Sequence, residues 1–375
     1  MAAKPGKVFI IAEAGVNHNG SIAVAKRLVK AAALAGADAV KFQAFRADRL
    51  ATRQVPKAEY QKKTTGNSQS QWQMLKLLEL GEAAHIRLKK YTEALGIEFL
   101  SSPFDLKSAD MLIKKIGVKK IKVPSGEITN APLLLKLASS GLPMIVSTGM
   151  STMKEIEEAL GVLAFGYTRR KPDKLSCASF RKAFKSSRGK NAIRKKITLL
   201  QCTTQYPAPS ELAHLRVMRV FGKRFGVSVG YSDHTKGIAA SLVAVALGAS
   251  VIEKHLTLDQ TMEGPDHKAS LKPDRFREMV EKIRRQEDLL SEVGKNEMRR
   301  LLGRPKKSVS PIEKKNRQVA RKSIISSKLI RAGELFSEKN LDTKRSGQGI
   351  SPMRYWDVLG KTAVKNFTPG EMIYL

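Results

Sequence analysis

Short apolar runs that end in polar residues alternate with longer amphipathic stretches along the first two thirds of the chain. The stretches between the runs, such as Ile22–Ala35 and Ile156–Phe165, have the periodicity of helices that bury one face. The pattern therefore predicts repeated βα units. The predicted strands are Val8–Ala12, Ala39–Phe42, Ile97–Leu100, Lys120–Val123, Met144–Val146, Ile197–Leu200, Gly226–Val229 and Ser250–Ile252.

Eight successive βα units predict an α/β fold of the (β/α)8 type, a TIM barrel, with its active site at the carboxyl ends of the strands. An open doubly wound sheet is the alternative. Polar residues directly after nearly every run favour the barrel, because they would all meet at one mouth. Glycines suited to left-handed helix C-caps stand just before several predicted strands, at Gly36, Gly96, Gly117, Gly141 and Gly248.

The character of the chain changes after a predicted closing helix from Asp274 to about Val293. Residues 294–320 are basic and carry Gly303, Pro305 and Pro311, a composition typical of linkers. Residues 321–375 contain short β-rich runs with recurring Gly-Glu turns, which predict a small β-rich module. We expect a barrel domain over residues 1–293, a linker over 294–320 and this module over 321–375.

Two stretches interrupt the βα rhythm. Gln54–Gln73 is polar and is expected to be a long loop that could cover the barrel mouth. Tyr167–Lys196 is a basic insertion that includes Arg169-Arg170-Lys171, and we expect it to be solvated. The alternative for the basic insertion is that it contacts a partner.

The charge of the chain is strongly positive, with 68 Lys and Arg against 34 Asp and Glu and a formal net charge of +34. Such a surface favours acidic ligands, but aromatic residues are only 6% and are not interleaved with the basic ones, so nucleic acid is not expected as the primary partner. Cys177 and Cys202 are too few for a disulfide framework. With no apolar run of membrane-spanning length, we expect a soluble, cytoplasmic protein.

Two histidines follow neighbouring predicted strands near the end of the barrel. His234 lies in the stretch Gly230–Thr235, and His255 ends the stretch Ile252–His255. Two neutral imidazoles at adjacent strand ends could bind one divalent ion such as Mn²⁺ or Zn²⁺. The alternative is that each histidine is a hydrogen-bonded core residue.

Lysines and hydroxyls follow most of the other strands. Together with backbone amides they would form an anion site, most simply a phosphate site, although any one serine could instead be a turn or cap residue. The residues at these strand ends include Glu13, Lys41, Gln43, Ser102, Lys122, Ser125, Glu127, Ser147, Thr204, Tyr206 and Ser232.

Several of these residues lie in segments that resemble the N-acetylneuraminate (sialic acid) synthase family, which includes legionaminic and pseudaminic acid synthases. The resemblance runs from Val8 to the C-terminus, where residues 321–375 are similar to the antifreeze-like (SAF) domain of those enzymes. The segments are EAGVNHNG at 13–20, VKFQ at 40–43, SPF at 102–104, PSGE at 124–127, STGM at 147–150, YP at 206–207, SDHT at 232–235, EKH at 253–255, GPDH at 264–267 and KRSGQG at 344–349.

The resemblance implies condensation of phosphoenolpyruvate with an open-chain N-acetylated mannosamine to a nine-carbon 2-keto acid, with release of phosphate. It implies that His234 and His255 bind a divalent ion, Mn²⁺ or Mg²⁺. It implies that Glu13 or Glu127 handles the proton. The positions that match phosphoenolpyruvate contacts are Lys41, Ser102, Lys122, Ser125, Ser147, Thr204 and Ser232, and those that match sugar contacts are Gln43, Glu127, Tyr206 and Asp266.

Arg345 matches an arginine that reaches into the barrel of a neighbouring subunit, which implies a domain-swapped homodimer. Three positions depart from the pattern of the sialic acid enzymes: Ser102 where Thr is frequent, Pro124 where Gly is frequent and Thr204 where Asn is frequent. An aldolase on the same barrel, metal-dependent or forming a Schiff base through Lys122, is the rival enzyme class. The sequence does not distinguish the simple mannosamine, its 6-phosphate and a 6-deoxy diacetamido sugar.

Overall fold

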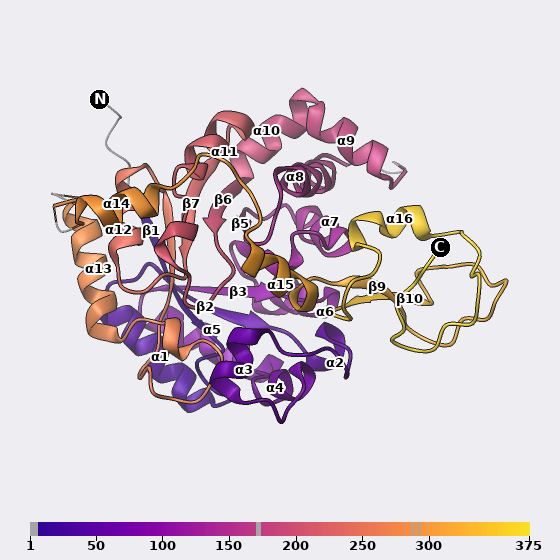
Figure 1. The fold of residues 1–375 in the computed structure, drawn as a ribbon, viewed down its shortest axis with the longest axis horizontal. Helices are drawn as coiled ribbons and strands as arrows, with labels where there is room; N and C mark the ends of the chain where they lie inside the picture. The colour runs from indigo at the N-terminus through magenta and orange to yellow at the C-terminus, as the bar shows by residue number, and fades with distance from the viewer. Residues whose placement is uncertain (1–6, 170–173, 287–288, 292) are drawn as a thin grey trace.

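The computed structural model of the protein describes residues 7–169, 174–286, 289–291 and 293–375 (Figure 1). Each predicted strand is present, and most extend two or three residues further into the polar endings than the apolar runs alone indicated. The strands are β1 (Phe9–Gly15), β2 (Ala39–Ala44), β3 (Glu98–Pro103), β4 (Ile121–Val123), β5 (Met144–Ser147), β6 (Ile197–Cys202), β7 (Ser228–Asp233) and β8 (Val251–His255).

The strands form one parallel eight-stranded sheet in the order β3-β2-β1-β8-β7-β6-β5-β4. β1 pairs with both β2 and β8, and β3 packs beside β4, so the sheet curls into a barrel with helices around it (Figure 1). The TIM-barrel prediction is confirmed, and the open sheet is excluded. The main outer helices are α1 (Ile22–Leu34), α5 (Glu82–Ala94), α7 (Ala131–Ser139), α8 (Met153–Thr168), α11 (Val217–Phe225), α12 (Ala239–Ala246) and α13 (Pro273–Arg285).

The interior of the barrel is filled by a layer of apolar side chains separate from the core between strands and helices. The layer comprises Ile11, Ala39, Leu100, Ile145, Leu200 and Val251, all less than 9% exposed. Their sequence neighbours, such as Ile10 and Ala12 on β1, belong to the outer core instead. Because strand side chains alternate between faces, the residues two and four positions after this layer must also point into the barrel.

Residues 321–375 form a small module with its own core, as expected. β9 (Ser323–Ser326) and β10 (Leu341–Lys344) pair antiparallel, and η5 (Pro352–Arg354) and α16 (Tyr355–Val358) follow. The core includes Ile324, Phe336 and Phe367, each at most 1% exposed. Backbone hydrogen bonds join this module to the barrel, because the amide of Arg345 donates to Leu50 O and Thr52 donates to Arg345 O.

The stretch expected to be a linker contains two helices, α14 (Lys295–Leu302) and α15 (Pro311–Ala320). Its glycine and prolines mark helix ends: Gly303 follows α14 with φ +48°, and Pro311 begins α15 after the N-cap Ser310. Figure 1 shows α15 between the barrel and the C-terminal module. The composition typical of linkers therefore belongs to a folded connection.

Helices also occupy the two interruptions. In the polar stretch after β2 these are α3 (Glu59–Thr65) and the start of α4 (Gln71–Leu77), and the short α2 (Ala47–Leu50) precedes them. Outside the two interruptions, α6 (Leu106–Asp110) and the π-helix η1 (Met111–Ile116) follow β3. In the basic insertion, α9 (Cys177–Lys185) and α10 (Ser187–Lys196) precede β6, while Arg170 and Lys171 lie outside the described residues. No helix in the described ranges is long and apolar enough to cross a membrane.

Candidate active site

The alternation along the barrel strands places polar side chains directly above the apolar interior layer. Ile11 is followed two residues later by Glu13, Ala39 by Lys41, Ile145 by Ser147 and Val251 by Glu253 and then His255. These polar side chains converge on one cavity at the carboxyl ends of the strands. Thirteen of the predicted residues line it: Glu13, Lys41, Gln43, Lys122, Ser125, Ser147, Thr204, Tyr206, Ser232, His234, His255, Asp266 and Arg345.

Two predicted residues do not line this cavity. Ser102 is fully buried beneath it and accepts a hydrogen bond from Lys41 Nζ at 3.3 Å, so it contacts a cavity residue rather than the cavity. Glu127 is also fully buried, in the 3-10 turn η2 (Ser125–Glu127), where it accepts from Asn130 at 2.7 Å and lies 3.6 Å from Lys322 Nζ. Glu127 does not line the cavity, whereas the neighbouring Ser125 and Gly126 do, and its Oε1 has no hydrogen-bond partner within the described chain. Its expected roles as a sugar contact and as a candidate for handling the proton stay predictions.

Two lysines and two carboxylates form a buried network on the cavity floor. Lys41 Nζ lies 2.6 Å from Glu13 Oε2 and 3.6 Å from Glu253 Oε2, and Lys122 Nζ lies 3.0 Å from Glu253 Oε1. Ser232 Oγ donates to the same Glu253 oxygen at 3.0 Å. Glu253 thus orients both lysines. In the sequence Glu253 appears only within the EKH segment at 253–255, and the alternation from Val251 is the signal that could have identified it.

The two carboxylates of this network have opposite pKa shifts. Burial raises the pKa of Glu13 to about 7, although the nearby Lys41 opposes the shift. Burial also acts on Glu253, but Lys122 and Lys41 outweigh it and lower its pKa to about 2. Burial lowers the pKa of Lys122, while Glu253 acts to restore it. A permanently ionised carboxylate beside one that titrates near neutrality is an arrangement suited to anchoring charge and moving a proton.

The two predicted metal ligands lie side by side in the cavity, with ring centroids 5.5 Å apart. His234 Nδ1 lies 2.7 Å from Thr203 O, which accounts for one ring nitrogen and leaves Nε2 available. Burial and the neighbouring His234 hold the pKa of His255 well below its usual value, so its imidazole is neutral. Its buried Nδ1 has no hydrogen-bond partner among the described residues, although Asp266 Oδ2 lies 3.8 Å away.

These features fit a divalent ion held by His234 and His255. The neutral imidazole of His255, with its unused buried nitrogen, is the form that binds metal. Burial acts to lower the pKa of His234, but Cys202 and the Thr203 carbonyl outweigh it and raise that pKa, so metal binding there would release a proton. Two protein ligands would leave coordination positions for substrate oxygens. The described part of the chain has no group of three His, Cys, Asp or Glu side chains that would form a fuller cage. The ion would therefore depend on substrate or water for the rest of its ligands.

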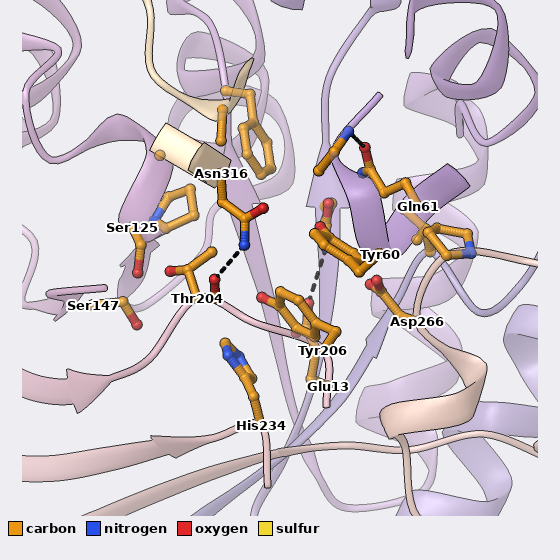
Figure 2. Close-up of a pocket in the computed structure, with 18 of the residues that line it drawn as sticks. Glu13, Tyr60, Gln61, Ser125, Ser147, Thr204, Tyr206, His234, Asp266 and Asn316 are labelled. Atoms are coloured by element: carbon orange, nitrogen blue, oxygen red, sulfur yellow. Dashed lines mark hydrogen bonds between the residues drawn. The ribbon is translucent and has the colours of Figure 1, made fainter. Parts of the chain in front are cut away.

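Several other polar atoms at the cavity are buried without a hydrogen-bond partner within the described chain. They are Ser147 Oγ, Thr204 Oγ1 and Arg345 Nε. Because unpaired buried polar groups cost free energy, such a set at one cavity indicates a site that is completed by a polar ligand. Figure 2 shows Ser125, Ser147 and Thr204 together on one side of the cavity and Tyr60 and Asp266 on the other.

Residues from α3 and α4 cover the mouth of the cavity. Tyr60 stacks on Tyr206 with ring centroids 5.0 Å apart, and Tyr206 stacks in turn on His234 at 4.1 Å (Figure 2). Sequence reasoning placed a covering loop here but did not identify Tyr60 or the pocket-lining Met74. Short-range patterns could not have identified them, because their role depends on how the two helices fold back over the barrel.

Arg345 also lines this cavity, but it does so on the barrel of its own chain. Its Nη1 donates to Gln71 Oε1 at 3.3 Å, and its guanidinium lies 5.6 Å from the Phe104 ring centroid. The structure describes one chain, so the expectation that Arg345 reaches a second subunit stays a prediction. Two buried cations hold the connection along the barrel of this chain. Lys307 donates to Cys202 O at the end of β6, and Arg321 donates to Met150 O after β5.

The resemblance found in the sequence makes phosphoenolpyruvate the expected anionic substrate. On that expectation Lys122→Ala should raise its apparent KM by tenfold or more, in the range of about 1.5–3 kcal/mol for a charged hydrogen bond. The apparent KM for the sugar should change much less, because the lysine lies on the floor with Glu253. Steady-state kinetics with each substrate varied in turn would measure both. Lys119→Ala serves as a control, because Lys119 is an exposed lysine three residues earlier in the chain. Equal increases for both substrates would place Lys122 elsewhere in the reaction.

The fold and the cavity define a TIM-barrel protein with a polar site at the strand ends and a small β-rich C-terminal domain. A model of the NeuB family matches residues 28–295, and a model of the SAF domain matches residues 321–375. N,N′-diacetyllegionaminic acid synthase of Campylobacter jejuni is 47% identical, covering 98% of this chain and 99% of that protein. The protein of the same name from Legionella pneumophila is 41% identical, covering 96% and 92%.

The solved structure of the spore coat polysaccharide biosynthesis protein SpsE of Bacillus subtilis has the same fold. It is 31% identical with a TM-score of 0.75, and the match covers 98% of this chain and 94% of that one. The chain belongs to the NeuB family, whose members include legionaminic, pseudaminic and sialic acid synthases. The resemblance drawn from the sequence, including the SAF domain, is confirmed.

Proposed function

We propose that the protein condenses phosphoenolpyruvate with an open-chain N-acetylated sugar of the mannosamine type, forming a nine-carbon 2-keto acid and releasing phosphate. The observation that carries the proposal is the floor network of Glu13, Lys41, Lys122 and Glu253, which lines the same cavity as the adjacent imidazoles of His234 and His255. The names of the relatives support the product class. Their lengths support it as well, since the chain covers nearly all of each.

We propose a 6-deoxy diacetamido sugar as the acceptor. The two relatives with the highest identities reported above make N,N′-diacetyllegionaminic acid. One wall of the cavity is apolar. The lysines and arginines in the described lining of the whole cavity are Lys41, Lys122 and Arg345, and both lysines are ion-paired on the floor. A 6-phosphate would require further cations at the far end of the sugar, whereas a methyl group suits the wall of Val16, Leu50, Met74, Leu75, Leu78 and Phe104.

In this proposal the chain first fixes the two substrates relative to each other. Lys41 and Lys122 bind the anionic groups of phosphoenolpyruvate, with the hydroxyls of Ser125, Ser147 and Ser232 as further donors. Its C3 can then reach the aldehyde carbon of the sugar, held near His234 and His255, and form the new C–C bond. A divalent ion on those histidines, when bound, would polarise the aldehyde oxygen as a Lewis acid.

Attack from C3 leaves a cationic centre at C2, to which water adds. We assign to Glu13 the removal of a proton from that water, because Glu13 lines the cavity and its pKa lies near neutrality, whereas Glu127 does not line the cavity. Phosphate then leaves with cleavage of the C2–O bond, and the keto group forms. One proton of the water ends on the new hydroxyl of the sugar and the other on phosphate, so the step balances.

A panel of sugars tests the proposal. Purified protein with phosphoenolpyruvate and Mn²⁺ would be given N-acetylmannosamine, its 6-phosphate and the 6-deoxy diacetamido sugar, and phosphate release would be measured. We expect the highest kcat/KM with the diacetamido sugar and the lowest with the 6-phosphate. No phosphate release with any of the three would reject the proposed reaction. A higher kcat/KM for the 6-phosphate would reject the acceptor.

Borohydride treatment distinguishes the rival aldolase class. An enzyme that forms a Schiff base through Lys122 would be trapped as a covalent adduct with its carbonyl substrate, visible as a mass increase of the intact chain. In the proposed reaction no such adduct forms. Lys122 is instead held 3.0 Å from Glu253 Oε1, which supports a role for it as a charged binding group.

We also propose a homodimer, in which two chains would exchange C-terminal domains. Exchange would reproduce the contacts of Arg345 described above, since domain swapping pairs identical surfaces. Mixing Arg345→Ala chains with His234→Ala chains tests it. Recovered activity would show exchange, whereas no recovery despite proven subunit mixing would assign Arg345 to its own barrel.

The two free cysteines, Cys177 and Cys202, support a reducing compartment such as the cytoplasm.

A further inference from the structure

Helix α15 lies at the active site but belongs to neither matched domain. The NeuB family match ends at residue 295 and the SAF match begins at residue 321, whereas α15 spans Pro311–Ala320. Asn316, Val319 and Ala320 on this helix line the same cavity as the floor lysines. The helix therefore contributes part of the cavity wall.

A buried carboxylate fixes α15 to the barrel. Glu313 Oε1 accepts hydrogen bonds from the backbone amides of Met150 at 2.9 Å and Thr204 at 3.1 Å, which follow β5 and β6. Its other oxygen accepts from the amide and hydroxyl of Ser310 in a capping box. Glu313 is 3% exposed, so these bonds are shielded from water. The position of α15 over the cavity is thus fixed by interactions with two site loops.

One turn further along α15, Asn316 faces the cavity with a defined amide orientation. Its Nδ2 donates to Thr204 O at 2.7 Å and to Gln205 Oε1 at 3.2 Å. Both acceptors lie on the loop after β6, so the NH2 group is committed to the barrel. Figure 2 shows the amide oxygen turned away from Thr204, on the side where Tyr60 lies. Asn316 is 4% exposed. Because its NH2 group is bonded to the barrel, the orientation of the amide is fixed and this oxygen is left as an acceptor.

We propose that Asn316 is a specificity residue whose Oδ1 accepts a hydrogen bond from the acceptor sugar, from an acetamido N–H or a hydroxyl. The inference rests on the proposed function, because it assigns the ligand of the same cavity. The floor of the cavity carries the cations that suit phosphoenolpyruvate, whereas Asn316 is a neutral lining group whose amide oxygen lies on the side of Tyr60 (Figure 2). A neutral acceptor at that place matches a donor-rich sugar better than an anion.

The test compares Asn316→Ala, Asn316→Asp and the wild type in the full chain with Mn²⁺, phosphoenolpyruvate and either N-acetylmannosamine or the 6-deoxy diacetamido sugar. We expect Asn316→Ala to raise the sugar KM about tenfold while the phosphoenolpyruvate KM stays within about twofold. Asn316→Asp keeps an oxygen toward the sugar and should retain more sugar affinity than Ala, provided that its thermal unfolding midpoint shows a folded protein. Gln318→Ala is the matched control, since Gln318 is an exposed amide on the same helix.

Two results would overturn the assignment. An unchanged sugar KM in Asn316→Ala would show that the oxygen does not contact the sugar. Equal increases in both KM values, with a lower kcat, would show that Asn316 only holds the loop after β6. Failure of the wild type to release phosphate with any sugar is a different outcome, because it rejects the proposed function itself. If that occurred, calorimetric binding of the diacetamido sugar to wild type and Asn316→Ala would decide the contact separately.

Discussion

Replacing His234 or His255 with alanine should abolish turnover, with a loss of about a thousandfold or more in kcat, while the fold remains intact. Each imidazole lines the cavity from the end of a strand, and neither is needed for the apolar layer below. Loss of either would remove one of the two proposed metal ligands and with it the stabilisation of the developing alkoxide. Phosphate release measures turnover, and Mn²⁺ binding by calorimetry or electron paramagnetic resonance measures the ligand role independently.

His214→Asn is the control for these variants. His214 lies outside the cavity and has a positive φ of 46°, which asparagine tolerates. Its activity and Mn²⁺ affinity should stay within about twofold of wild type. Activity within about tenfold of wild type for both His234→Ala and His255→Ala would remove the metal assignment.

Glu13→Gln should lower kcat by about a hundredfold to ten-thousandfold, the range for a lost general acid–base group. Burial raises the pKa of Glu13 to about 7, so the wild type should lose kcat/KM as pH falls through that value and the carboxylate is protonated. Glutamine preserves size and cannot titrate. The pH profile of kcat/KM should therefore lose its acidic limb near 7 in the variant.

Glu127→Gln separates this role from that of a second buried carboxylate. Glu127 pairs with Asn130 and Lys322 outside the cavity, so its replacement should affect the unfolding midpoint more than the pH profile. An acidic limb that persists in Glu13→Gln and disappears in Glu127→Gln would reverse the assignment. In that case the turn after β4 would have to move when substrate binds.

The fold and most of the cavity residues could be predicted from the sequence because both follow from strand alternation. An apolar residue that fills the barrel, such as Ile11 or Val251, fixes which later side chains point inward. Polar residues directly beyond β-rich runs therefore identify the site. Glu127 lies outside this geometry, because it follows β4 in a 3-10 turn and does not line the cavity.

Residues delivered by long connections could not be predicted in this way. Tyr60, in α3, contacts Tyr206, which in turn contacts His234, and Tyr60 is distant in sequence from both. Asn316 lies in a stretch whose glycine and prolines are typical of linkers, yet the buried Glu313 fixes that stretch to the loops after β5 and β6. Such tertiary anchoring leaves no local periodicity, so composition alone indicated a flexible connection.

The junction between barrel and SAF domain has a consequence for substitutions. Its strand-like pairing uses the main chain of Arg345, with Leu50 and Thr52 as partners, while the side chain of Arg345 points into the cavity. Backbone pairing does not depend on residue type, so this position can mutate without losing the attachment. A substitution at this position would therefore change the side chain presented to the cavity while the backbone attachment between the barrel and the C-terminal domain is kept.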